Sequence, residues 1–180
     1  MAERVLVDAV SSYSADILAP GLDIVFCGLN PALSAAGPDL QGHNFSHRSN
    51  RFWPVLHLAG FTDVRLAPQD ERRLLEYGCG ISAVVSRPTT RADEVRPEEF
   101  RQARPEFEVK MRRYAPNVIA FLGKRAFATM IGSPDIGWGR YPEPFAAATA
   151  WVLPNPSGLN RRFSLTALVD AYSDLRSAMV

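Results

Sequence analysis

The stretch DIVFCGLNP, residues 23–31, decides the fold of this 180-residue chain. The apolar run at 24–27 has no polar alternation, which is typical of a strand buried on both faces of a sheet. Gly28 and the Asn30-Pro31 pair follow immediately. A residue before proline is held in an extended conformation, which restricts the direction of the Asn30 side chain. Because α/β folds place ligands beyond the carboxyl ends of parallel strands, we expect Asn30 to lie in a functional site.

Outward from this stretch, strand patterns alternate with helical ones. Further strands are predicted at 80–85, 117–122 and 148–153, and helices at 4–18, 52–59, 68–77, 97–114, 124–131 and 165–179. Pro105 predicts a break or a late start of the helix at 97–114, and 132–144 is predicted to be a loop. Strands that alternate with helices predict one domain over residues 1–180, a three-layer α/β/α fold with a mostly parallel central sheet.

The composition is that of a globular protein, with 47% hydrophobic and 22% charged residues. No apolar run approaches the ~20 residues that span a bilayer, and the N-terminus lacks the layout of a signal peptide. We therefore expect a cytoplasmic protein without a membrane partner. Basic residues gather at 47–51 and 161–162, whereas acids such as Asp70-Glu71 and Glu98-Glu99 are expected on helix exteriors.

Cysteines and histidines give no sign of a metal or a cofactor. Cys27 and Cys79 both stand in apolar surroundings, so we expect reduced core thiols, and two cysteines cannot supply the four thiolates of an iron–sulfur cluster. The three histidines at 43, 47 and 57 show no zinc-binding spacing. We expect a protein that needs neither metal nor organic cofactor.

A second Asn-Pro pair, Asn155-Pro156, also follows a predicted strand. Asn-Pro often does no more than start a turn. However, the carboxyl ends of parallel strands meet at one edge of a sheet, so the loops at Asn30 and Asn155 are predicted to share one site.

Several ordered motifs run from about Asp23 to the C-terminus: GLNP (28–31), GHNF (42–45), NRFW (50–53), YGCG (77–80), RPT (87–89), LGK (122–124), WG (138–139) and NPSGL (155–159). Together they resemble the family of mismatch-specific uracil-DNA glycosylases and thymine-DNA glycosylases, the bacterial mismatch-specific branch most closely. The resemblance implies a uracil-DNA glycosylase-like fold. It also implies a monomeric, monofunctional enzyme of base excision repair, associated with the nucleoid through its substrate.

The activity implied by the resemblance is base flipping followed by hydrolysis. The enzyme would take uracil, or thymine and damaged pyrimidines, out of G-mismatched duplex DNA and leave an abasic site. Asn30 would position the attacking water, although an amide cannot take its proton at neutral pH. Phe45 would stack on the flipped base, its alternative being a loop anchor buried in the core. The residues expected to bind the nucleotide are Gly28, Leu29, Ala35, Phe45 and Asn155.

The NPSGL motif implies contact with the duplex itself. Leu159 matches an apolar wedge that fills the gap left by the flipped base, and an exposed leucine in a polar loop agrees with this. The expected DNA-binding residues are Ser157, Gly158, Leu159, Asn160 and Arg161, with Arg161 near a phosphate. Arg48, Arg51 and Arg162 are expected to be general phosphate or surface contacts.

Two departures from the bacterial pattern bear on selectivity and catalysis. Ala35 stands where those relatives have Ser, as in the thymine-processing branch, so the base range is open. Asp93 stands where they tend to have Asn. Asp93 could accept the water's proton or stabilise the cationic sugar, which gives the hypothesis that Asn30 and Asp93 share the catalysis. The alternative is an aspartate that caps the next turn.

Two other classes of function compete with this interpretation. A non-catalytic protein that senses mismatches through Leu159 would bind such DNA without leaving abasic sites. A small enzyme acting on free nucleotides would leave the wedge loop unexplained, and the chain has no phosphate-binding glycine fingerprint. Lys110 and Lys124 are the only lysines and both lie on predicted helices, so Schiff-base lyase chemistry is not expected.

Overall fold

A five-stranded sheet organises the computed structural model, which describes residues 16–31 and 42–180. The strand order is β2-β1-β3-β5-β4. The strands are β1 (Ile24–Gly28), β2 (Cys79–Ala83), β3 (Val118–Leu122), β4 (Gly139–Arg140) and β5 (Thr149–Leu153). All neighbouring strands are parallel except β4, which pairs antiparallel with β5. The predicted, mostly parallel sheet is confirmed.

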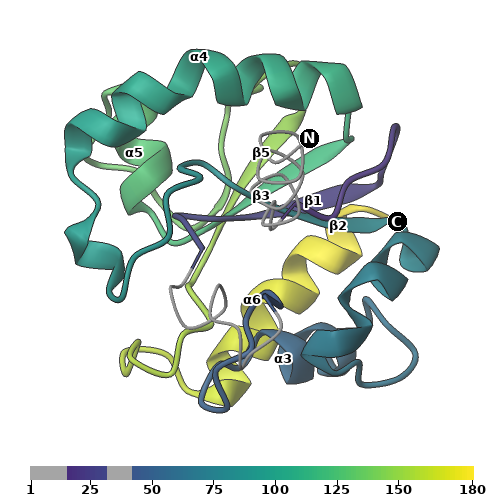
Figure 1. The fold of residues 1–180 in the computed structure, drawn as a ribbon. Helices are drawn as coiled ribbons and strands as arrows, with labels where there is room; N and C mark the ends of the chain where they lie inside the picture. Colours follow the sequence, from purple (N-terminus) through teal and green to yellow (C-terminus); the bar gives the residue numbers. More distant parts are fainter. Residues whose placement is uncertain (1–15, 32–41) are drawn as a thin grey trace, which may run out of the picture.

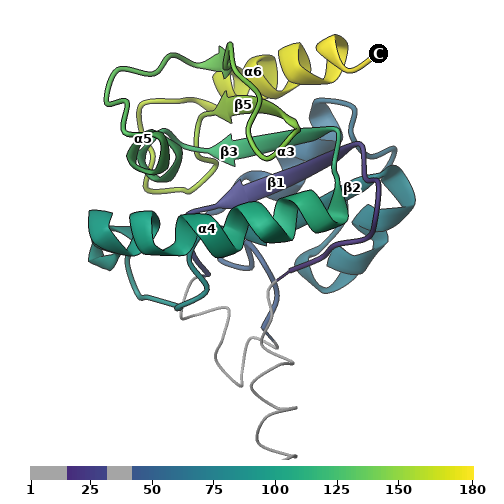
Figure 2. The same cartoon turned by 90° about the horizontal axis from the view of Figure 1, so that it is seen from above.

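Helices cover both faces of this sheet. Figure 1 shows α4 (Pro97–Tyr114) and α5 (Arg125–Ile131) above it, and α3 (Phe52–Leu58) and α6 (Leu165–Ala178) below it. The turned view of Figure 2 shows α4 running in front of the strands. Two 3₁₀ helices, η2 (Pro68–Tyr77) and η3 (Ala92–Glu94), complete the elements of the described chain. The predicted three-layer α/β/α arrangement is confirmed.

The central strands are apolar throughout because each of their faces is buried. Side chains alternate along β1, so that Phe26 packs edge-on against Phe52 of α3, whereas Val25 and Cys27 belong to the core under α4 and α5. On β3, Phe121 stacks on Phe127 of α5 with ring centroids 4.3 Å apart. This double burial explains why the runs of apolar residues show no alternation.

Pro105 does not interrupt its helix, which corrects the prediction of a break or a late start. α4 is continuous over Pro97–Tyr114. The proline ring removes only the hydrogen bond to the carbonyl of Arg101, and both residues are exposed, so water can solvate that carbonyl.

Two further predictions need correction. The segment predicted as a loop at 132–144 contains β4, where Gly139 pairs with Val152. A two-residue edge strand is too short to produce a periodic pattern. The helix predicted at 4–18 is contradicted at its end, where Ile17 forms an antiparallel bridge to Ile81. The part before residue 16 lies outside the described residues.

Both cysteines are free and buried, as predicted. Burial raises the pKa of the Cys27 thiol far above its ordinary value and that of Cys79 to about 12. Within residues 16–31 and 42–180, no helix is long and apolar enough to cross a membrane. No group of three or more metal-ligating side chains occurs in the same part of the chain.

Candidate active site

The GLNP motif leaves β1 at the carboxyl edge of the sheet and is held by the segment that follows β2. The amides of Val84 and Val85 donate to the carbonyls of Gly28 and Leu29, at 3.1 and 3.0 Å. The amide of Thr89 donates to the carbonyl of Pro31 at 3.2 Å. These bonds extend the β1–β2 pairing beyond both strands, so the backbone around Asn30 has a defined position.

The side-chain amide of Asn30 is oriented by two hydrogen bonds. Its Nδ2 donates to the carbonyl of Arg87 and to Oγ1 of Thr89, each at 2.8 Å. The Thr89 hydroxyl gives its own proton to the carbonyl of Arg91, at 2.7 Å, so it can only accept from Asn30. Because both partners are acceptors, the side-chain amide must direct Nδ2, and not Oδ1, towards them.

The Oδ1 of Asn30 is the atom left for a ligand. Both Nδ2 protons have partners, and Oδ1 makes no hydrogen bond within the described part of the chain. Asn30 is only half-buried. An amide oxygen in this setting can accept a hydrogen bond from water or from a ligand group, but it cannot act as a base.

Asp93 lies in η3, on the loop that also carries Thr89. Its carboxylate is paired with Arg91, at 3.0 Å from Nε to Oδ1 and 2.7 Å from Nη2 to Oδ2, and its side chain is 65% exposed. The hydrogen bond from Arg91 lowers the pKa of Asp93 below its ordinary value. A carboxylate with a lowered pKa is ionised at neutral pH and is a weaker proton acceptor.

Two arginines hold the loop that carries Thr89 and Asp93. Arg87 makes a bidentate ion pair with Glu99 of α4, at 2.9 and 3.0 Å, and this bond lowers the pKa of Glu99 to about 2. Arg125 of α5 donates to the carbonyls of Ala92, at 2.9 Å, and Val95. The loop is thus tied to both helices above the sheet.

Phe45 is the predicted stacking residue. Its backbone has φ +52°, a left-handed conformation that is rare for a bulky side chain and is found mostly where surrounding contacts impose it. One ring face stacks on Phe52, with centroids 4.0 Å apart and planes at 27°. The side chain is half-buried, so it anchors the loop and is still partly open to a ligand.

Glu71 of η2 holds the GHNF segment, a role that the sequence analysis missed. Its side chain is buried, contrary to the expectation that this acid lies on a helix exterior. Oε2 accepts from the backbone amide and Nδ2 of Asn44, at 2.7 and 3.0 Å, and Oε1 lies 3.3 Å from Nδ1 of His43. The carbonyl of Asn44 in turn accepts from Nε1 of Trp53 at 3.2 Å. No local signal distinguishes this acid from an exposed one, because its partners lie in another segment.

The loop after β5, the predicted wedge loop at 155–160, is stabilised by its own side chains. Oδ1 of Asn155 accepts from the amide of Ser157 at 2.9 Å. Oγ of Ser157 accepts from the amide of Leu159 at 3.2 Å, and Nδ2 of Asn160 donates to the carbonyl of Asn155 at 2.9 Å. Asn155 lies against Gly123, which follows β3. The loop is therefore a preformed structure at the same sheet edge as Asn30.

Leu159 projects from this loop with 86% of its surface exposed. Its neighbour Gly158 packs so closely on Ser49 that an added Cβ would lie 2.4 Å from Oγ and 2.7 Å from the backbone oxygen of Ser49. Figure 1 shows the yellow-green loop after β5 beside the blue loop before α3. Position 158 thus requires glycine for a close approach of two loops, and that approach presents Leu159 outward.

Arg51 is not a free surface cation, which corrects its expected role as a general phosphate contact. Nη1 donates to the carbonyl of Phe163 at 2.5 Å, and Nη2 donates to those of Ser157 and Asn160 at 2.8 and 2.9 Å. Nε also contacts the carbonyl of Pro156 at 3.4 Å. This guanidinium holds the wedge loop together, whereas Arg161 and Arg162 are exposed.

The predicted site residues that the structure describes fall into two groups of contacts. Asn30 connects through Thr89 to the loop of Asp93, and the 43–50 segment meets the wedge loop at Ser49 and Gly158. Ala35 lies outside the described residues, so its predicted place in the base pocket has no structural account.

A comparison with protein-family models agrees with this geometry. The model described as "Uracil DNA glycosylase superfamily" matches residues 15–176, which span the whole sheet, both asparagine loops and most of the closing helix α6. The members of this superfamily are DNA glycosylases and act on DNA. From the match over nearly its full length, the chain belongs to the uracil DNA glycosylase superfamily.

Proposed function

We propose that this chain is a monofunctional glycosylase that flips uracil out of G-mismatched duplex DNA and hydrolyses its N-glycosidic bond. Thymine or damaged pyrimidines opposite guanine are further candidates for its base range. The observation that carries the proposal is the oriented amide of Asn30, whose Nδ2 is held by Arg87 and Thr89 while Oδ1 is left for a ligand.

The proposed chemistry depends on departure of the base. The C1′–N1 bond breaks, its electron pair leaves with uracil, and the sugar becomes cationic. Asn30 Oδ1 accepts a hydrogen bond from a water, whose oxygen then forms the new bond to C1′. The water's proton passes to solvent or to the departed base, because Asn30 cannot hold it.

Asp93 has a supporting role in this proposal. Of the two roles that its carboxylate offers, electrostatic stabilisation of the cationic sugar suits it better than proton acceptance, because the Arg91 hydrogen bond lowers its pKa. Arg91 also offsets part of the charge, so the contribution is modest and Asn30 has the larger share.

Recognition of the substrate is assigned to three segments. Gly28 and Leu29 provide backbone at the flipped base, with Ala35 as a further pocket residue, and the open part of Phe45 stacks on the base. Leu159 enters the duplex as a wedge. Around it, Asn155 meets the flipped nucleotide, and Ser157, Gly158, Asn160 and Arg161 contact the flanking DNA. The proposed partner is duplex DNA, bound by a monomer.

The test is an excision assay with labelled duplexes that contain G:U, A:U, G:T or G:C pairs, and with uracil in a single strand. Abasic product is revealed by strand cleavage in alkali. We expect product from G:U above all, a large loss for Asn30→Ala, and near-normal activity for Arg112→Ala, a control on the exposed surface of α4. Absence of product from every duplex with the unmodified protein would refute the proposal.

A non-catalytic mismatch sensor is the competing function, and the 86% exposure of Leu159 is the observation in its favour. Such a protein would bind G:U duplexes in a gel-shift experiment and would lose affinity with Leu159→Ala, yet it would leave no abasic site. The fixed orientation of Asn30 favours the enzyme, since a sensor has no need to orient a water.

A further inference from the structure

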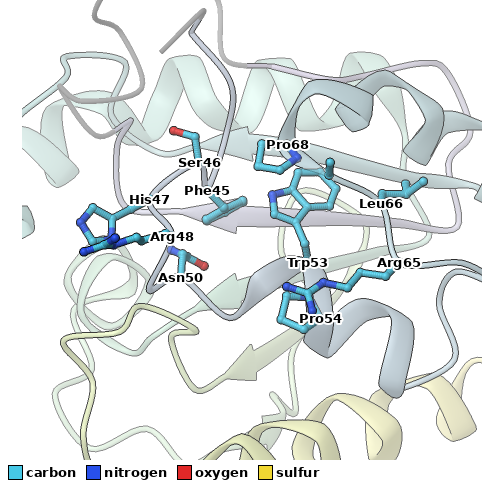
Figure 3. A pocket seen from close by; sticks show the side chains of 11 residues that line it. Phe45, Ser46, His47, Arg48, Asn50, Trp53, Pro54, Arg65, Leu66 and Pro68 are labelled. Atoms are coloured by element: carbon cyan, nitrogen blue, oxygen red, sulfur yellow. The ribbon is translucent and has the colours of Figure 1, made fainter. Parts of the chain in front are cut away.

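A cavity of about 270 Å³ lies beside the GHNF segment and the start of α3. Its lining residues are Phe45, Ser46, His47, Arg48, Asn50, Trp53, Pro54, Arg65, Leu66, Ala67 and Pro68. They come from the loop before α3, from the start of α3 and from the segment that leads into η2 (Figure 3). Asn30 and the wedge loop are not among these residues, and the cavity shares only Phe45 with the residues proposed for the base site.

The cavity is positively charged. Among the described residues, Arg48, Arg65 and His47 are its titratable lining residues, and no aspartate or glutamate of this part of the chain lines it. In Figure 3, His47 and Arg48 lie together on one side while Arg65 extends over Pro54 on another. The amide of Ser49 donates to Nδ1 of His47 at 3.2 Å, so a neutral His47 carries its proton on Nε2, as a further donor.

The guanidinium groups of Arg48 and Arg65 are available to bind a ligand. Within residues 16–31 and 42–180, neither Arg48 nor Arg65 forms an ion pair. Arg51, only three residues from Arg48, instead donates its guanidinium hydrogen bonds to loop carbonyls. The cavity therefore contains two guanidinium groups whose N–H donors can bind an external anion.

Part of the cavity lining is apolar and buried. Trp53 and Leu66 are only 4% and 2% exposed, and Nε1 of Trp53 is already bonded to the carbonyl of Asn44. Apolar groups beside a guanidinium lower the local dielectric and so strengthen its attraction to an anion. Guanidinium is also the group best matched to the oxygens of a phosphate.

The cavity adjoins the wedge loop. Ser49 follows Arg48 in the chain and is the residue against which Gly158 packs. A duplex that meets Leu159 carries a phosphate every ~3.4 Å of its axis on each strand, so its backbone passes close to Arg48.

We propose that this cavity binds a phosphodiester group of the DNA backbone beside the flipped nucleotide, with Arg48 and Arg65 as its ligands. The inference rests on the proposed function in taking DNA as the substrate and Leu159 as the wedge, but not on base release. The contact anchors the backbone at one flank while Leu159 enters the duplex, and it carries no sequence information.

The test replaces single phosphates with neutral methylphosphonates around the G:U pair and measures binding by the unmodified protein and by Arg48→Ala/Arg65→Ala. The matched control is Arg112→Ala/Arg113→Ala, which removes two exposed arginines from α4. We expect one neutralised phosphate to weaken binding by the unmodified protein ~10-fold or more, and to have little effect on the Arg48/Arg65 variant. In a salt titration that variant should lose about 1 from the magnitude of the slope of log K against log[salt], because one phosphate contact is removed, and the control should keep the full slope.

Equal sensitivity of both proteins to every methylphosphonate, with an unchanged salt slope, would overturn the proposal. A site for free phosphate ions would instead show competition by inorganic phosphate at matched ionic strength, without dependence on any one backbone position, and would overturn the assignment to DNA. Base release is scored separately. A protein that shows the phosphate-specific effect but yields no abasic product would contradict the glycosylase proposal and leave this one standing.

Discussion

Replacing Thr89 by valine tests whether the orientation of Asn30 matters for catalysis. The side chain is 4% exposed, and its hydroxyl accepts from Nδ2 of Asn30 and donates to the carbonyl of Arg91. Valine has nearly the same shape but offers a methyl group in place of the hydroxyl. The change therefore removes one of the two bonds that orient the amide while it preserves the packing.

The expected size follows from the groups left without partners. Arg91 is exposed, so water can solvate its carbonyl, whereas the Nδ2 proton of the half-buried Asn30 loses its acceptor. An unsatisfied polar group of this kind costs ~1–3 kcal/mol in stability. If about 1–2 kcal/mol of that orienting energy is lost from the transition state, the excision rate falls ~5- to 30-fold.

The assay is single-turnover excision from a G:U duplex with enzyme in excess, together with duplex affinity and thermal unfolding. We expect the rate to fall for Thr89→Val while the affinity changes little, because Thr89 is buried away from the DNA. Thr89→Ser keeps the hydroxyl and should restore a rate near that of the unmodified protein.

Two results would refute the reasoning. Excision by Thr89→Val at the unmodified rate would mean that the carbonyl of Arg87 alone orients the amide, or that the orientation has no part in catalysis. A Thr89→Ser protein as slow as Thr89→Val would show that the methyl group matters and the hydroxyl does not.

Three further predictions concern other parts of the site. Arg51→Met should remove the guanidinium from four loop carbonyls, of which those of Pro156 and Ser157 keep a backbone donor. The change should destabilise the protein by about 2–4 kcal/mol in chemical denaturation and weaken G:U binding; an unchanged stability and affinity would show that the wedge loop does not depend on Arg51. Asp93→Asn should slow single-turnover excision by no more than ~10-fold, and the rate should not gain a new pH dependence near neutrality; an unchanged rate would remove Asp93 from catalysis. Because burial raises the thiol pKa values, Cys27 and Cys79 should resist a thiol-specific reagent at pH 8 and both react after unfolding; rapid reaction in the native state would contradict their burial.

The elements of the fold and the place of the site follow largely from local sequence. Apolar runs without alternation predict the buried parallel strands, and the Asn-Pro pairs after two of them predict that Asn30 and Asn155 lie at one edge of the sheet. The strand prediction depends on periodicity, and the site prediction depends on the conformation of the residue before proline. Neighbouring residues in the chain determine both. The same local rules fail at Pro105, where exposure to water removes the expected penalty, and at β4, where two residues are too few for a pattern.

The contacts that orient the site depend instead on the folded molecule. Asn30 meets Thr89 across 59 residues of chain, Glu71 meets Asn44 across 27, and Arg51 meets Ser157 across 106. A polar side chain carries no local sign of its partner, because that partner is whichever distant carbonyl or amide the sheet and helices bring within reach. For this reason Arg51 and Glu71 look from sequence like surface charges, and only the packed structure shows them holding the loops of Leu159 and Phe45.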